Sequence, residues 1–338
     1  MLVEKITARI KLWTSATLSY AGRLQLIKTT LFSMQVYWMS MFILPMAVIK
    51  RIESILARFL WRGPSLAANG SKVSWDRICY PLKEGGLGIK SSQEWNKAAL
   101  LKHFWRILTC DHSIWSGWVH AVLLKGKSIW EVKAPSNASW TWRNLMGSRS
   151  WCKGLFQTKI GNGERTSLCF DYWVPGGYSL AETLPASTIS SSTSTIRWDS
   201  KVSTIIRNGE WVFPNGHHVL QRVWNSITFL PNSHRQDTIK WRESPSGIFS
   251  IASAWNWLRR TRGNHNLHSL IWYSNHVPRY ALTLWLASMG RLSTLDRPKM
   301  SFFNGGRHCV LCGIEDESHD HLFFHCSPVL GLSAPCEL

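Results

Sequence analysis

The chain has 338 residues, of which 45% are hydrophobic and only 17% are charged; this excludes wholesale disorder and allows two or three compact units. The formal net charge is +19, and a surplus of this size favours polyanionic partners, nucleic acid before anionic membrane. The first residues carry charges in place of an apolar run, and four of the eight cysteines lie singly, so we expect an intracellular protein, of the nucleus or cytoplasm, without a secretory leader.

A helical pattern covers residues 1–63. Ser19 precedes a run of good helix formers as an N-cap, and after Pro45 a second run places its apolar residues on one face. The uncharged stretch 29–49 is long enough to cross a bilayer, but Pro45 breaks it, Ser and Gln interrupt it, and both of its flanks are basic. We therefore expect a buried helix that ends near Leu44, and no membrane partner.

Residues 64–178 form a tryptophan-rich connecting region of helix and hairpin. The segment GGLG (85–88) lacks the strand-then-helix layout of a dinucleotide site and is interpreted as a turn. A helix is predicted over 94–108, and the Asn-Gly dipeptide at 162–163 predicts a tight β-hairpin. Residues 179–198 are dominated by Ser, Thr and Ala, which predicts a flexible linker.

The last predicted unit spans residues 199–338. Helices are expected over 199–208 and 217–228, followed by two short strands around a Ser-Pro-Ser-Gly turn. A further helix begins at about Ile251, and another covers 279–290. The whole chain is thus expected to be α+β and predominantly α-helical, with small β-hairpins and a knuckle-like C-terminal unit.

Five basic side chains are candidates for nucleic-acid contacts. Arg23 and Lys28 project from the helix that follows Ser19, and Lys97, Lys102 and Arg106 lie along the helix over 94–108. The alternative is that these charges form solvated helix faces. The 21 tryptophans could likewise stack on bases, but burial in a core is the favoured interpretation.

The segment CVLCGIEDESHDHLFFHC (309–326) crowds three cysteines and three histidines together. Cys309 and Cys312 form a C-x-x-C pair, whose turn aims two thiolates at one metal ion. His321 and Cys326 would complete a C-x2-C-x8-H-x4-C site. The rival is His321 with His325, which would share one face of an α-helix.

Four protein ligands would leave no position for an activated water, so the expected cofactor is one structural Zn²⁺. Such a site can fold a segment that is too small to hold itself together. Glu317 and Asp320 could orient His321 by accepting a hydrogen bond from its ring. Residues 301–338 hold one arginine against five acidic residues, so the knuckle itself should repel phosphate.

Further motifs recur in one known family. They are LSYAGRLQLIKTTL (18–31), YWMSMFILP (37–45), FLWRG (59–63), SWDRICYPLKEGGLGI (74–89), EWNKAALLKHFWRI (94–107), IGNGERTSLCFDYW (160–173), GIFSIASAW (247–255) and LTLWLASMGRLSTLDR (282–297). With these motifs and its C-terminal cysteine cluster, nearly the whole chain closely resembles the C-terminal part of reverse transcriptases from plant non-LTR (LINE-type) retrotransposons.

The resemblance implies a thumb-like region over residues 1–63 and a reverse transcriptase zinc-binding domain within 199–338, with its knuckle at 309–326. The family's zinc pattern matches the four ligands named above. Its polymerase signature, Tyr/Phe-Ala-Asp-Asp, is missing from the sequence, as are recognisable endonuclease and ribonuclease H carboxylates. Nothing in the chain would therefore hold the paired Mg²⁺ ions of nucleotidyl transfer.

The expected function is that of a non-catalytic C-terminal fragment of such a reverse transcriptase, which binds template RNA or target DNA through basic surfaces. One alternative is a protein-interaction scaffold that docks on the polymerase palm domain of the parent element or on another partner. A second alternative is an inactive relic of a decayed element, because the tail after Cys326 lacks a tryptophan that the family carries there.

Overall fold

The computed structural model describes residues 1–338 except 14–17, 68–69, 185–195, 215–217, 297–307 and 333–338. The chain divides into two compact units. Unit 1 comprises Met1–Gln35, Met46–Ser91 and Arg260–Leu338, and unit 2 comprises Val36–Pro45 and Ser92–Arg259. This grouping joins segments that are distant in sequence, and so differs from the four consecutive regions predicted above.

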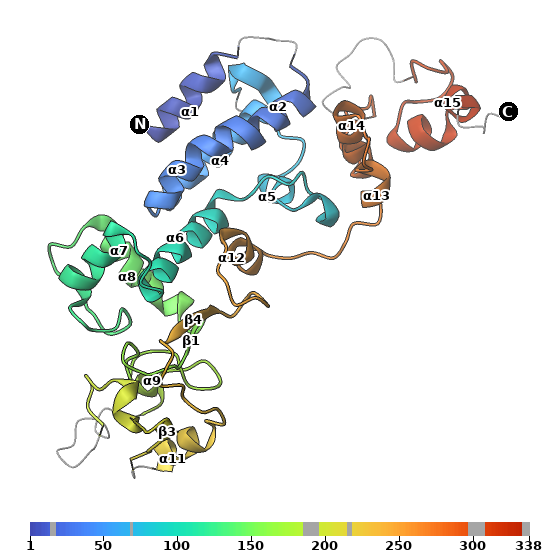
Figure 1. Cartoon of the computed structure of the whole chain (residues 1–338). Helices are drawn as coiled ribbons and strands as arrows, with labels where there is room; N and C mark the ends of the chain where they lie inside the picture. The colour runs from blue at the N-terminus through green and yellow to red at the C-terminus, as the bar shows by residue number, and fades with distance from the viewer. Residues whose placement is uncertain (14–17, 68–69, 185–195, 215–217, 297–307, 333–338) are drawn as a thin grey trace. The chain divides into compact units, whose positions relative to one another are not determined.

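Unit 1 is helical in its described residues (Figure 1). Its elements are α1 (Leu2–Lys11), α2 (Tyr20–Leu26), the π-helical η1 (Ile27–Leu31), α4 (Met46–Arg62), the 3-10 turns η2 (Gly63–Ser65) and η3 (Leu82–Glu84), α5 (Trp75–Ile78), α13 (His268–Ile271), α14 (Pro278–Ser288), the π-helical η6 (His321–His325) and α15 (Ser327–Leu332). The N-cap prediction is confirmed, because the Ser19 hydroxyl accepts a hydrogen bond from the amide of Gly22.

Helices α1 and α4 pack side by side in unit 1. The predicted apolar face of α4 is buried, with Ile52, Leu56 and Phe59 at 1% exposure or less. The GGLG segment forms the expected turn: a Cβ on Gly86 would lie 2.0 Å from the carbonyl oxygen of Tyr80, so only glycine fits there. The indole of Trp285 on α14 donates to the carbonyl of Gly85 (3.0 Å), which fastens α14 to this turn.

Unit 2 mixes helices with short strands. Its elements are α6 (Ser92–Leu108), α7 (Ile114–Trp118), the π-helical η4 (Val119–Leu124), α8 (Trp140–Cys152), β1 (Phe156–Lys159), α9 (Leu180–Thr183), the 3-10 turn η5 (Val202–Ile205), β2 (Ile206–Arg207), β3 (Glu210–Trp211), α11 (His218–Asn225), β4 (Thr238–Trp241) and α12 (Ile251–Leu258). α3 (Phe32–Met41) runs from unit 1 into unit 2.

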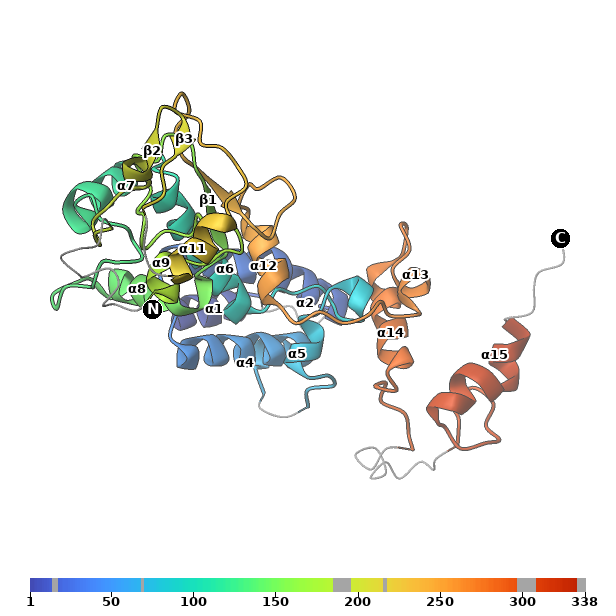
Figure 2. The same cartoon turned by 90° about the horizontal axis from the view of Figure 1, so that it is seen from below.

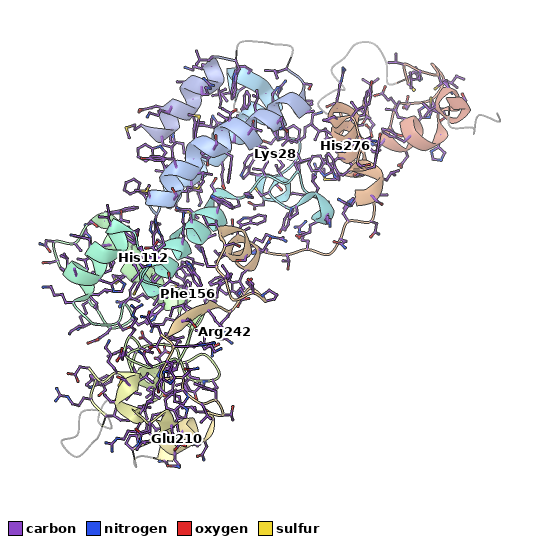
Figure 3. The ribbon with its side chains drawn as sticks, viewed as in Figure 1. Lys28, His112, Phe156, Glu210, Arg242 and His276 are labelled. Carbon is purple, nitrogen blue, oxygen red and sulfur yellow. The ribbon has the colours of Figure 1, made fainter. Side chains whose placement is uncertain are left out.

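One core of unit 2 forms around α6 and α12, which lie side by side in both views (Figures 1 and 2). Ala98 on α6 and Ala254 on α12 are both fully buried, and such small side chains let two helix backbones approach closely. Phe156 on β1, labelled in Figure 3, stacks on Phe104 with ring centres 6.2 Å apart and packs at a tilt against Trp241 at 5.2 Å. Trp241 is fully buried, as the core interpretation of the tryptophans predicts.

A second core of unit 2 spans the predicted linker. Trp173 stacks on Trp211 (5.7 Å), and Trp224 stacks on Phe213 (4.8 Å). Residues from both sides of the linker, including Leu184 and Ile196, are buried in this one cluster. Residues 185–195 of the predicted linker lie outside the described residues, so the linker stays a prediction; the described residues on either side pack into one core.

The predicted hairpin at Asn162-Gly163 is wrong. Strand β1 ends before this dipeptide and pairs antiparallel with the distant β4, with Phe156 opposite Trp241. A tight hairpin forms instead at Asn208-Gly209, between β2 and β3, where both residues have positive φ (49° and 80°). The expected helix over 199–208 is therefore also wrong, since this segment contains η5 and β2.

The remaining helices follow the sequence pattern closely. α12 begins at Ile251 as predicted, α14 and α11 lie within the predicted ranges to one residue, and α3 ends at Met41 rather than Leu44. In the described residues after β4, no second strand follows the Ser-Pro-Ser-Gly turn. The predicted class, α+β and predominantly α-helical, is confirmed. Among the described helices, none combines the length and apolar character needed to cross a bilayer.

Candidate metal centre

Cys309 and Cys312 flank a tight turn in the C-terminal module. The carbonyl of Cys309 accepts from the amide of Gly313 (2.7 Å), and its amide donates to the carbonyl of Glu315 (2.7 Å). Gly313 closes the turn with φ +69°, a left-handed conformation that suits glycine. An isolated bridge between His308 and Asp316 fixes the base of this loop.

His321 and Cys326 bracket the single wide turn η6. The amide of Cys326 donates to the carbonyl of His321 (2.7 Å), which is the five-residue closure of a π-helical turn. Across this turn, the ligand atoms of Cys326 and His321 lie within 4.8 Å of each other. His325 is not part of the cluster; its Nδ1 lies 3.1 Å from the carbonyl of Asp320, and its side chain is exposed.

The structure brings the four predicted ligands together. The ligand atoms of Cys309, Cys312, His321 and Cys326 all lie within 4.8 Å of one another. The Sγ atoms of Cys309 and Cys326 are 3.9 Å apart, and Cys312 Sγ is 3.3 Å from His321 Nε2. In a tetrahedral zinc site, bonds of about 2.0–2.3 Å place the ligand atoms at comparable separations. The donor set can therefore hold one metal ion.

A carboxylate orients the ring of His321, but it is neither of the two that the sequence suggested. Oε2 of Glu315 lies 2.8 Å from His321 Nδ1, which leaves Nε2 turned toward the cysteines. Glu317 instead accepts from the amide of Leu295 (3.2 Å), and Asp320 precedes η6 as its N-cap residue. Spacing alone does not distinguish Glu315 from its acidic neighbours.

The surroundings shift the pKa values of the cluster's ligands in different directions. Hydrogen bonds from the amides of Glu315 and Ile314, followed by the contact with His321, lower the pKa of Cys312 to about 6. Burial opposes the charged form of His321, but its contacts with Cys312, Cys309 and Glu315 raise its pKa. Burial raises the pKa of Cys326. A bound cation would offset that cost, because metal ligation requires the thiolate.

Four protein donors complete the coordination that zinc prefers in structural sites. Cys309, Cys326 and His321 are buried, and only Cys312 is half-exposed. The arrangement therefore suits cross-linking of the turn at Cys309 to the wide turn η6, and not the activation of water. Apparent binding free energies of about 10–16 kcal/mol in comparable small sites would suffice to order this module.

The predicted nucleic-acid residues of unit 1 have intramolecular contacts. Arg23 donates from Nε to the carbonyl of Leu18 and from Nη1 to that of Leu60, both at 3.0 Å, and lies over the ring of Tyr20. Lys28 is half-buried on η1 (Figure 3), and burial lowers its pKa. Arg23 thus joins α2 to α4, and its guanidinium is largely occupied.

The three predicted residues of unit 2 all lie on α6. Lys97 and Lys102 are exposed, with Lys97 5.9 Å from the ring centre of Trp151. Arg106 is half-buried and forms an ion pair with Asp111 at 2.6 Å. Of the five candidates, Lys97 and Lys102 therefore keep ammonium groups that a polyanion could reach.

The fold and the site together define a C-terminal module that carries a Cys3His cluster. Residues 249–331 match the family described as zinc-binding in reverse transcriptase. This match confirms the resemblance to a reverse-transcriptase fragment of a plant retroelement over its zinc-binding domain, and the cluster at 309–326 lies inside the matched range.

Two curated proteins of Arabidopsis thaliana are similar to the chain. One, named "Putative ribonuclease H protein", is 26% identical over 98% of this chain and 54% of its own length. The other, named as an uncharacterised mitochondrial protein, is 28% identical over 42% of this chain and 93% of its own length. The chain thus spans about half the length of the first relative.

Proposed function

We propose that the chain is a non-catalytic C-terminal segment of a retrotransposon reverse transcriptase that binds RNA or DNA, with one structural Zn²⁺ in its C-terminal module. The observation that carries the proposal is a separation of charge. The module around the metal ligands is acidic, whereas no acidic residue lies between Glu243 and Asp296, a stretch that holds five arginines. The free cysteines support a reducing location, in the nucleus or cytoplasm.

The acid-free stretch exposes both cations and aromatic rings. Arg260, Arg279 and Arg291 are exposed. Tyr273, in the connection between α13 and α14, is 54% exposed, and Tyr280 on α14 is 70% exposed. Exposed aromatic rings beside arginines are the usual means of binding single-stranded nucleic acid, because every base offers a face for stacking. This surface was missed from the sequence, where no arginine of this stretch was singled out.

Fluorescence anisotropy with labelled single-stranded RNA and DNA, over a range of KCl concentrations, tests this proposal. Binding should weaken steeply with salt, and Tyr280→Ala should raise the Kd about tenfold, in line with about 1–3 kcal/mol per stacked base. Tyr37→Ala removes a ring that is 66% exposed on α3 and should leave the Kd unchanged. Binding without salt dependence, or equal effects of the two substitutions, would contradict the proposal.

Zinc is tested by elemental analysis of the full chain, purified without chelator. One zinc per chain is expected, and Cys312→Ser should lose it. Cys110→Ser is the matched control, since this half-exposed cysteine lies outside the cluster. A folded chain that carries no zinc, or another metal in its place, would contradict this part of the proposal without touching the nucleic-acid part.

A protein-interaction scaffold is the second candidate. Leu270, Val277 and Leu284 of the α13–α14 region are 60%, 49% and 36% exposed, and apolar side chains in this number suit a protein partner such as the polymerase palm domain. Calorimetric titration with a palm-domain fragment separates the candidates. Binding that persists at high salt and is lost in Val277→Asp would favour the scaffold.

The proposal that the chain is not itself an enzyme needs its own test, because one relative is named as a ribonuclease H. Purified chain should neither extend a primer on an RNA template nor cleave the RNA strand of an RNA–DNA hybrid. Activity in either assay would overturn the proposal. Absence of nucleic-acid binding as well as activity would favour the inactive relic.

A further inference from the structure

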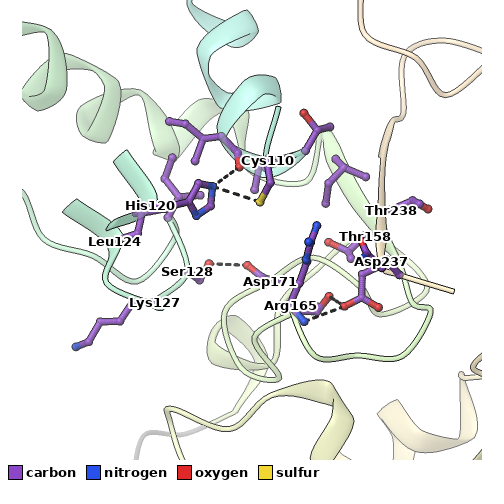
Figure 4. A pocket seen from close by; sticks show the side chains of 17 residues that line it. Cys110, His120, Leu124, Lys127, Ser128, Thr158, Arg165, Asp171, Asp237 and Thr238 are labelled. Atoms are coloured by element: carbon purple, nitrogen blue, oxygen red, sulfur yellow. Dashed lines mark hydrogen bonds between the residues drawn. The ribbon is translucent and has the colours of Figure 1, made fainter. Parts of the chain in front are cut away.

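A cavity of about 430 Å³ with both polar and apolar lining residues lies within unit 2, remote in sequence from the metal ligands (Figure 4). Its volume is within the range of small-molecule sites in proteins, which is about 300–1,000 Å³. The end of α6, η4, β1 and the loop before β4 contribute its wall. Figure 4 shows Cys110 and His120 on one side of the cavity and Arg165 facing them from the other.

The hydrogen bonds of His120 determine the role of the Cys110 sulfur. Nε2 of His120 lies 2.8 Å from the carbonyl oxygen of Ile107 and 3.4 Å from Cys110 Sγ. A carbonyl can only accept, so Nε2 carries the proton, and the sulfur can share the same N–H only as an acceptor. A thiolate accepts far better than a thiol, so this geometry favours the ionised form of Cys110.

The backbone at Cys110 is also unusual. Its φ is +49°, a left-handed conformation at the end of α6, where glycine is the ordinary residue. Holding a side chain there costs on the order of 1 kcal/mol, and such strain concentrates at functional positions. The conformation holds the half-exposed sulfur at the cavity wall beside His120.

The groups around Cys110 shift the pKa of its thiol in opposite directions. The hydrogen bond with His120 lowers the pKa of Cys110 below that of an ordinary thiol; partial burial opposes this, and the nearby Arg165 adds to it. Asp111 and the carbonyl end of α6 act against the thiolate. By contrast, burial raises the pKa of Cys169 to about 12, so that thiol should be inert.

The cavity also carries an unpaired cation. Arg165 is exposed; its amide donates to Asp237, and its guanidinium makes no hydrogen bond or ion pair with the described residues, whereas both carboxylates of the wall are occupied. Asp171 accepts from the Ser128 hydroxyl and the Ser167 amide, and Asp237 accepts from several donors of the loop 161–166. A ligand in the cavity would therefore meet the thiolate and a free positive charge.

We propose that Cys110 is a modifiable thiol in a ligand cavity, and that its co-reactants are small disulfides bearing carboxylates, the class of glutathione disulfide. The Cys110 thiolate attacks one sulfur of the disulfide, so that a new S–S bond forms as the old one breaks. The departing half leaves as a thiolate and takes a proton from solvent. No other oxidant is needed, and Arg165 holds a carboxylate of the retained half.

The test uses the full chain with its metal bound, treated with glutathione disulfide and analysed by peptide mass spectrometry over time. Cys110 should be modified first, at least about tenfold faster at neutral pH than Cys79, which is also half-exposed. His120→Asn should slow the reaction and shift its pH dependence upward. His112→Asn, a nearby exposed histidine outside the cavity, should change neither.

A second comparison tests the ligand class. Arg165→Gln should slow the reaction with glutathione disulfide and leave the reaction with uncharged hydroxyethyl disulfide unchanged. If both reactions slow equally or neither slows, the carboxylate assignment is wrong. If Cys110 reacts no faster than Cys79, or if His120→Asn reacts as the wild type does, the reactive thiol itself is refuted. The difference in thiolate absorbance at 240 nm between wild type and Cys110→Ser provides a readout that does not depend on the His120 variant folding.

Discussion

Substitution of Glu315 by Ala is expected to weaken metal binding by the Cys3His cluster about tenfold. The carboxylate lies 2.8 Å from Nδ1 of His321 and fixes the ring with Nε2 toward the cysteines. Loss of such an outer partner ordinarily costs 10–100-fold in affinity, roughly, and the low end applies because Glu315 is 65% exposed and water can replace it. The effect should appear as faster loss of the metal, since the four ligands themselves are unchanged.

Competition with a chromophoric zinc chelator, followed by absorbance, measures this affinity directly. Asp320→Ala is the matched control, because it removes a carboxylate from the same segment that makes no contact with the His321 ring. Its affinity should stay within about twofold of wild type. If Asp320→Ala weakens binding as much as Glu315→Ala, or if Glu315→Ala has no effect, then the assignment of Glu315 as the orienting group is refuted.

Three further predictions concern stability and charge. Asp237→Ala should lower the free energy of unfolding by about 2–4 kcal/mol in urea titrations, since the carboxylate accepts from two glycine amides and the Thr166 hydroxyl; the exposed ion pair lost in Asp199→Ala should cost less than about 1 kcal/mol. Arg23→Gln should lower the free energy of unfolding by about 1–3 kcal/mol and leave the Kd for RNA unchanged, because the guanidinium bonds two carbonyl groups of its own unit; a raised Kd at unchanged stability would contradict this. Burial raises the pKa of Asp171 above its unfolded value, so the stability that this residue contributes is fully present below the unfolded pKa and is lost as the pH rises through the folded pKa. The free energy of unfolding of Asp171→Asn should therefore rise relative to that of the wild type from about pH 4 upward. A difference between the two proteins that stays constant across pH would refute the assignment.

The helices could be predicted because their signals are local. The apolar face of α4, the Ser19 cap and the start of α12 at Ile251 depend on residues within one or two turns, and the structure follows them. Two of the Asn-Gly dipeptides in the chain show where local signals fail. The dipeptide closes a hairpin at 208–209 but not at 162–163. At 162–163 the carboxylate of Asp237, more than seventy residues later in the chain, accepts hydrogen bonds from the loop amides, and β1 pairs with β4 instead of with a neighbouring strand.

In the metal site, too, local patterns predict some residues and not others. The four ligands could be predicted because a C-x-x-C turn and a following His and Cys are local patterns. The choice of Cys326 over His325 could not be derived from α-helical spacing, because η6 is a π turn. Glu315 was missed because four acidic residues lie close to His321 in sequence, and only the turn closed by Gly313 selects one of them.

The charge separation leads to a last prediction, on how metal and nucleic acid are coupled. If phosphate contacts come from Arg279 and its neighbours, and the acidic metal module makes none, then removing the metal changes no cation at the interface. Chelation should raise the Kd for RNA by disordering part of unit 1, yet leave the slope of log Kd against log salt unchanged. Arg279→Gln should instead reduce that slope by about 0.7, the value for one lost phosphate contact on a single strand. A reduced slope after chelation would mean that the metal module itself touches the phosphates, despite its acidic residues.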